Sequence, residues 1–276
     1  MNFKIVSDSS SDITSLTVKD VSYATVPLKI STNEREFVDL PSSDTADMLS
    51  YLASYKGRSR SSCPNASEWE AEFEGADNIF CVTITSGLSG SYNSAVSAMH
   101  AHLEAHPQKR IHVVDTLSVG PEAELIIEEL CRLIGSGADF DEIVKSIEEY
   151  KEKVFLIFAL KSLHNLACNG RVSRLSANVA GALGIRIVGR ASEQGVLDLT
   201  DKTRGERKML ATILNNMEKN GFSGGKVRIH HCEAEESANE LKDLILNAYP
   251  DADVTVIPTR MLCSFYAERG GLLVGY

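Results

Sequence analysis

Residues 78–106 read NIFCVTITSGLSGSYNSAVSAMHAHLEAH, and this stretch decides the fold class. Its first seven residues are an apolar run of the length expected for a buried strand. The loop that follows is rich in Ser, Thr and Gly and contains no acidic or basic residue as far as residue 95. Residues 92–106 then have the composition of a helix. A strand, a short polar loop and a helix in this order predict one βα unit of a mostly parallel sheet.

The same alternation runs through the first half of the chain. Apolar runs that predict strands and periodic segments that predict helices follow one another, with Pro27 marking a sheet edge or a strand end. The expected strands are residues 3–8, 23–30, 78–84 and 111–116, and the expected helices are residues 44–55, 92–106, 121–137 and 140–153. We therefore expect an N-terminal α/β domain over residues 1–153, with helices on both faces of its sheet.

The second half of the chain has a different pattern and predicts an α+β domain over residues 154–276. A hairpin is expected at residues 185–204, around the turn SEQG. The other expected strands are residues 154–160, 226–231 and 253–258, and the expected helices are residues 161–170, 175–184, 205–219 and 236–249. The two domains are expected to pack closely, with a cleft between them.

Composition and charge exclude several classes of function. The 276 residues include 28 basic and 38 acidic side chains, a formal net charge of −10, without a local basic stripe that would attract nucleic acid. No apolar run approaches the roughly 20 residues needed to cross a bilayer. The six cysteines lie far apart without a CxxC pair, which indicates free thiols in a reducing cytoplasm. We expect a cytoplasmic protein without a metal or cofactor.

Hydroxyl side chains gather where the expected strands lead into helices. In an open α/β sheet ligands bind at the carboxyl ends of strands, and helix N-termini attract anions there. Gly87 and Gly90 would let the backbone approach a ligand, and Ser86 and Ser89 would add donors. The polar junctions are Asp8-Ser9-Ser10, residues 59–67, residues 85–90 and Asp115-Thr116. They predict a site for a carboxylate or phosphate, although the same residues also serve as helix caps and turns.

Two other functions are compatible with these residues. The sequence GLSGS at 87–91 resembles the G-x-S-x-G nucleophile elbow, which would make Ser86 or Ser89 the nucleophile of a serine hydrolase acting on an acyl ester. Ser91 replaces the last glycine, however, and no spacing singles out the required acid and histidine. Alternatively, the basic segment 202–208 would dock an acidic partner in a regulatory module without ligand.

Seven motifs, in order along nearly the whole chain, resemble those of the DegV family. They are KIVSDSSSDI, YATVPLKI, SSCPNASEWE, ITSGLSGSYNSA, IHVVDTLSVG, NGRVSR and GVLDLTDKTRGERK. The resemblance implies a bacterial fatty-acid-binding protein of two domains, with a long-chain acyl group in a tunnel between them. It also implies a partner, a dihydroxyacetone-kinase-like fatty acid kinase that phosphorylates the carboxylate. The chain would then be a carrier and not the catalyst.

The resemblance also assigns residues to the head-group site. Ser61 stands where the family has a carboxylate-binding threonine, and Ser86 would be the second ligand of the carboxylate. Arg171 matches an arginine near the head group and the kinase-facing surface. The supporting residues are Ser62, Gly87, Ser89 and Gly90, and the weaker candidates are Ser9, Ser10, Thr116 and Arg269.

Two positions depart from the family pattern. Cys63 replaces the glutamine that follows Thr-Ser, and Ala267 replaces a histidine near the C-terminus. Arg269 is the residue expected to compensate, by pairing with the charge of the ligand.

Overall fold

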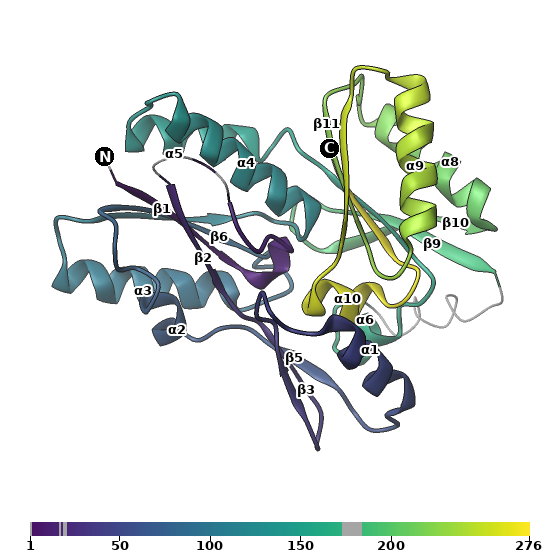
Figure 1. Cartoon of the computed structure of the whole chain (residues 1–276), viewed down its shortest axis with the longest axis horizontal. Helices are drawn as coiled ribbons and strands as arrows, with labels where there is room; N and C mark the ends of the chain where they lie inside the picture. Colours follow the sequence, from purple (N-terminus) through teal and green to yellow (C-terminus); the bar gives the residue numbers. More distant parts are fainter. Residues whose placement is uncertain (1, 17, 19–20, 173–183) are drawn as a thin grey trace.

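The computed structural model describes residues 2–16, 18, 21–172 and 184–276, and it contains three sheets (Figure 1). Most of the helix expected at residues 175–184 lies outside the described residues. Within the described residues, no helix is both long enough and apolar enough to cross a membrane.

The first sheet is parallel, as the βα alternation predicts, and has the strand order β2-β1-β6-β7. Its strands are β1 (Phe3–Asp8), β2 (Val21–Val26), β6 (Asn78–Thr83) and β7 (Arg110–Asp115). Because side chains alternate along a strand, Ile5 and Phe80 face one core while Val6 and Cys81 face another. The first core is covered by α4 (Pro121–Gly135) and α5 (Phe140–Tyr150), and the second by α2 (Ala66–Glu70) and α3 (Ser91–Ala105).

The second sheet is mixed, with the order β10-β9-β8-β13-β11-β12, in which only β11 and β12 run parallel. Its strands are β8 (Leu156–Leu160), β9 (Ile185–Ala191), β10 (Leu197–Arg204), β11 (Lys226–His231), β12 (Asp253–Pro258) and β13 (Leu272–Gly275). The helices α8 (Glu206–Lys219) and α9 (Glu235–Ala248) cover one face. The short helices α6 (His164–Cys168) and α10 (Met261–Ala267) pack on the other. The sequence analysis did not anticipate α10 or β13.

A third, small sheet was also not anticipated. The segment expected as one strand at residues 23–30 is divided at Pro27, because proline cannot donate a ladder hydrogen bond. Its first part is β2, and its second part enters an antiparallel sheet of order β4-β3-β5. The strands are β3 (Lys29–Ser31), β4 (Glu36–Val38) and β5 (Arg60–Ser62). The helix α1 (Thr45–Ser54) lies between β4 and β5 in the chain, and the 3-10 turn Ser9–Ser11 follows β1.

This small sheet and α1 contribute to the core of the second domain. Ile30, Phe37 and Met48 belong to the same buried cluster as Phe158 and Phe265. Figure 1 shows α1 and β3 beneath α6 and α10. The domain boundary predicted near residue 153 falls in the connection between α5 and β8, and the division into 1–153 and 154–276 stays a prediction of the sequence.

Candidate functional site

An apolar cavity of about 270 Å³ lies between the two larger sheets. Side chains of β8 form one wall of the cavity. Because they alternate along the strand, Leu156, Phe158 and Leu160 point to the cavity, while Ile157 and Ala159 pack under α8 and α9. The other apolar lining residues are Leu28, Ile84, Leu88, Val119, Leu166, Leu197, Leu262, Ala267 and Leu273. Because both halves of the chain supply walls, the cavity is the interdomain cleft that the sequence predicts.

The polar side chains of the cavity wall are linked to one another. The Ser61 hydroxyl and the Tyr266 phenol lie 2.5 Å apart, although 205 residues separate them in the chain. Arg171 Nε donates to the carbonyl oxygen of Leu88 at 3.2 Å, within the hydroxyl-rich loop. The polar or small lining residues are Ser61, Ser62, Cys63, Ser89, Gly90, Arg171, Cys263 and Tyr266. A group of donors therefore interrupts an otherwise apolar wall.

Tyr266 was not found by sequence analysis. Burial raises the pKa of this phenol above its usual value, against the opposing effects of the Ser61 hydroxyl and the Arg171 cation. Tyr266 is therefore a neutral O–H donor at pH 7. Its neighbour Ala267 is 2% exposed and also lines the cavity, at the position where the family resemblance implies a histidine.

The structure does not bring Ser86 and Gly87 into the cavity wall. Ser86 is exposed, and its backbone N–H donates to Asp115 Oδ1 at 3.0 Å. Gly87 packs against the turn between β9 and β10, where a Cβ atom would meet the carbonyl oxygens of Gln194 and Gly195 at 2.8 and 2.9 Å. The placement of Ser86 beside the head group is thus not supported, because the loop turns this residue toward Asp115.

The weaker candidates Ser9, Ser10 and Thr116 are buried, and their hydroxyl groups form hydrogen bonds within the first half of the chain. The Ser9 hydroxyl accepts from Leu28 N–H at 3.0 Å, and Thr116 Oγ1 donates to the Thr83 carbonyl at 2.9 Å. The Ser10 hydroxyl donates to Asp8 Oδ1 at 2.5 Å. None of the three is among the described residues of the cavity wall. These hydrogen bonds give the three residues a structural role, and a role in ligand binding stays a prediction.

Arg269, the residue expected to compensate for Ala267, lies at the surface. Its guanidinium is exposed and forms an ion pair with Glu233 at 2.7 Å. It is also outside the described cavity wall. Glu233 holds this cation at the surface, and the compensation expected from the sequence stays a prediction.

Asp8 positions the hydroxyl-rich loop from the end of β1. Its Oδ2 accepts from Ile84 N–H at 2.9 Å and from the Ser91 hydroxyl at 2.6 Å, so it holds the loop at both ends. Burial raises the pKa of Asp8, and its hydrogen bonds with Ser10, Ser91 and Ile84 oppose this effect. The loop conformation that places Ser89 and Gly90 at the cavity thus depends on a buried carboxyl group.

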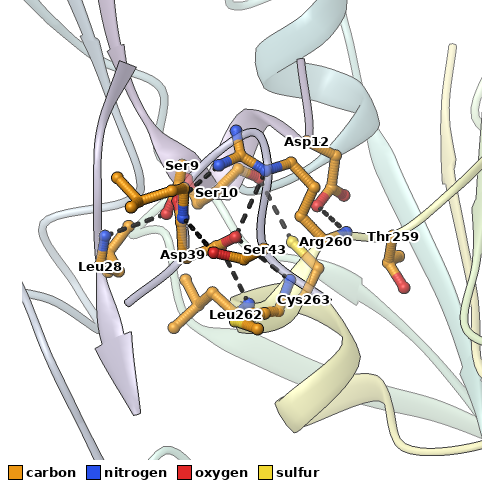
Figure 2. A network of polar contacts seen from close by, with 12 residues as sticks. Ser9, Ser10, Asp12, Leu28, Asp39, Ser43, Thr259, Arg260, Leu262 and Cys263 are labelled. Atoms are coloured by element: carbon orange, nitrogen blue, oxygen red, sulfur yellow. Dashed lines mark hydrogen bonds and ion pairs between the residues drawn. The ribbon is translucent and has the colours of Figure 1, made fainter. Parts of the chain in front are cut away.

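Asp39 positions α10 in a comparable way (Figure 2). The Asp39 carboxylate accepts hydrogen bonds from the backbone N–H groups of Met261 at 3.3 Å and Leu262 at 3.1 Å. These two N–H groups lie in the first turn of α10, where they have no acceptor within the helix. Arg260 Nε lies 3.3 Å from Asp39 Oδ1. Burial raises the pKa of Asp39 to about 6, although the Arg260 guanidinium opposes the shift. This cap from the first half of the chain fixes the helix that carries Tyr266.

Whole-chain comparisons agree with this architecture. The family model described as "Uncharacterised protein, DegV family" matches residues 2–276. The chain belongs to the DegV family. A DegV domain-containing protein of Streptococcus pneumoniae is 42% identical over 278 residues, which covers 100% of this chain and 99% of the relative.

Two solved structures are similar over nearly the full length of this DegV family chain. The Streptococcus pneumoniae Fatty Acid Kinase (Fak) B3 protein, loaded with linoleic acid, is 42% identical with a TM-score of 0.98, over 100% of this chain and 99% of that one. A DegV family protein from Eubacterium eligens, loaded with heptadecanoic acid, is 43% identical with a TM-score of 0.96, over 99% and 98% of the two chains. The two-domain α/β fold predicted from the sequence is confirmed by these similarities.

The hydrolase alternative finds no geometric support in this DegV family chain. Within the described residues, the hydrogen bonds of Ser86 and Ser89 include no histidine partner. His230, at the C-terminal end of β11, is enclosed by two carboxylates, with Nδ1 2.8 Å from Asp12 and Nε2 2.6 Å from Glu124. Both ring nitrogens of His230 are thus occupied, and this histidine does not contact either serine.

Proposed function

We propose that this protein binds one long-chain fatty acid in the interdomain cavity and presents its carboxylate to a partner kinase. The observation that carries the proposal is an apolar cavity between two domains with linked donors in its wall. The support from comparison is that two proteins over 40% identical along nearly the whole chain are loaded with fatty acids.

The apolar wall accounts for most of the affinity. Each buried methylene contributes about 0.8 kcal/mol, so an acyl chain gains far more from the leucine-lined wall than its head group gains from one hydrogen bond. A hydrogen bond to a charged carboxylate contributes about 1.5–3 kcal/mol. The polar residues therefore determine which end of the fatty acid lies where, and the tail supplies retention.

The donors of the head-group site are Ser61, Tyr266 and Arg171, assisted by Ser62, Ser89 and the backbone at Gly90. A carboxylate accepts several hydrogen bonds, so it can take one from the Ser61 hydroxyl and one from the neutral Tyr266 phenol when it replaces the hydrogen bond between these two groups. Arg171 supplies the positive charge that compensates the buried anion. In this arrangement Tyr266, from α10, supplies the donor that Ala267 cannot.

The carrier role follows from the same chemistry. Among the described residues, the cavity wall holds donors and one cation but no residue that the structure poises to activate a nucleophile, so the phosphoryl transfer belongs to the partner, a fatty acid kinase. The name of the similar Streptococcus pneumoniae protein supports a kinase partner for this chain. All six cysteines, each within the described residues, are free thiols, which supports a reducing cytoplasmic location.

The deciding experiment is solvent extraction of the purified protein followed by mass spectrometry of the extract. We expect one fatty acid per chain, and re-uptake of an added long-chain acid after delipidation. Protein that is empty on purification and that also fails to take up added long-chain acids would contradict the proposal. A fluorophosphonate probe distinguishes the hydrolase, since a carrier is not labelled.

A further inference from the structure

Three potential metal ligands meet on the first domain, far from the fatty-acid site. His102 lies in the last turn of α3, His106 is the C-cap residue of that helix, and Glu74 lies in the turn between α2 and β6. One ligand atom from each residue lies within 4.8 Å of the others. The two histidines are four residues apart, which places them on one face of the helix, and their ring centroids are 4.5 Å apart.

The surroundings of His102 leave one ring nitrogen free. The side chain is 2% exposed, and its Nδ1 lies 3.6 Å from Glu70 Oε1. Among the described residues its Nε2 has no hydrogen-bond partner, although the atom is buried. Buried polar atoms are nearly always paired, so a free one calls for an explanation. Metal-binding histidines characteristically offer one nitrogen to the ion while the other nitrogen contacts a carboxylate, and Glu70 is such a carboxylate.

Glu74 is the third potential ligand of the cluster. Lys109 Nζ is 3.4 Å from Glu74 Oε2. Because the Glu74 side chain is 70% exposed, it has room to leave this lysine and turn to an ion.

We propose that His102, His106 and Glu74 bind one divalent transition-metal ion of the Zn²⁺ class, with water completing a tetrahedral coordination. Two imidazole nitrogens and one carboxylate oxygen are a ligand set that Zn²⁺ accepts. The ion ties the C-terminal end of α3 to the turn after α2. Since α3 has 15 residues and is about 22 Å long, this site is separate from the fatty-acid cavity at the N-terminal end of the helix.

The test uses full-length protein freed of metal with a chelator, in a Cys168→Ser background. This background removes an exposed thiol that lies 3.6 Å from His164 and would offer Zn²⁺ a second site. Calorimetric titration with ZnCl₂ should give one ion per chain, and excess Zn²⁺ should raise the Tm by about 5 °C or more. Co²⁺ should give the visible absorption of a tetrahedral site without a thiolate charge-transfer band.

Variants identify the ligands. Glu70→Gln should weaken Zn²⁺ binding about 10- to 100-fold, because it alters only the support of His102. His106→Ala should weaken the binding more than this. The matched control is His100→Ala, another histidine of α3 outside the cluster, which should bind like the parent. The proposal would be overturned if the parent did not bind Zn²⁺, or if His106→Ala and His100→Ala bound it equally well. The fatty-acid content of the protein is measured independently of this result.

Discussion

His230 Nδ1 lies 2.8 Å from Asp12 Oδ2, and this fully buried contact joins two residues that are 218 positions apart. The other ring nitrogen lies 2.6 Å from Glu124 Oε2. Burial disfavours the charged imidazole, but the two carboxylates outweigh it and raise the pKa of His230 to about 9. Asp12 also accepts from the backbone N–H of Arg260 at 2.7 Å (Figure 2). A buried cation thus connects the two domains.

The first prediction concerns removal of this cation. His230→Ala leaves Asp12 and Glu124 buried without their shared partner, which should lower the free energy of unfolding by about 3–5 kcal/mol. Chemical denaturation at pH 7 measures the loss. His100→Ala, on the exposed surface of α3, is the control and should change stability by less than about 0.5 kcal/mol. Equal stability of the two variants would show that the ion pairs contribute nothing.

The second prediction is the pH dependence that follows from His230. Its folded pKa of about 9 exceeds the usual value of 6.5, so folding takes up a proton on this group. The corresponding stabilisation is complete below about pH 6.5 and is lost as the pH rises through 9, a change of roughly 3 kcal/mol. Unfolding curves at pH 6.5 and pH 9.5 should differ by this amount in the parent and by clearly less in His230→Ala.

The third prediction concerns Glu122, where burial raises the pKa to about 8. Its Oε2 is buried without a hydrogen-bond partner among the described residues. The folded protein therefore prefers the protonated carboxyl, and this residue also makes the fold less stable as the pH rises from about 4.5 to 8. Glu122→Gln should be stabilising at pH 9 relative to the parent and near neutral at pH 5. A variant that is destabilised equally at both pH values would contradict this origin.

The fourth prediction separates the serines of the head-group site. Ser61→Ala and Tyr266→Phe should each weaken fatty-acid binding roughly ten- to a hundredfold, since each removes one hydrogen bond to a charged carboxylate. Ser89→Ala should weaken it in the same direction. Ser86→Ala is the matched control from the same loop, because this side chain is exposed and outside the described cavity wall. Displacement of a fluorescent fatty acid measures the affinities. A loss of affinity in Ser86→Ala alone would contradict the prediction and would place the carboxylate at Ser86, as expected from the sequence.

The fifth prediction tests the contact between the hydroxyl-rich loop and the β9–β10 turn. Thr85 Oγ1 donates to the Gly195 carbonyl at 2.7 Å, and a Cβ atom on Gly195 would lie 2.1 Å from that hydroxyl. Gly195→Ala should therefore destabilise the protein by more than Gly221→Ala. Gly221 also has positive φ, but no atom lies within 4 Å of its added Cβ. Comparison with Gly221→Ala separates the steric clash at Gly195 from the cost of a positive φ in a residue with a Cβ atom, which is about 1–2 kcal/mol. Thermal unfolding measures the stability of both variants.

The amino-acid pattern alone was sufficient to predict the elements of the parallel sheet, most elements of the second half and the character of the site. Apolar runs with period two and helices with caps are local properties, so residues 78–106 and the hairpin at 185–204 could be predicted from their own patterns. The same patterns indicated a cleft with hydroxyl donors, and the motif order pointed to the family. Ser61, Ser62, Ser89, Gly90 and Arg171 do lie in the cavity wall.

Only the tertiary structure decided which side chains meet there. Ser86 and Ser89 are chemically alike and three residues apart, but Asp115 and the turn at Gly195 orient their loop so that Ser89 reaches the cavity. Tyr266 and Asp39 carried no local signal, because their roles depend on partners about 200 residues away in the chain. Local sequence fixes the conformation of a segment, whereas burial and hydrogen bonding between distant segments determine where a ligand finds its donors.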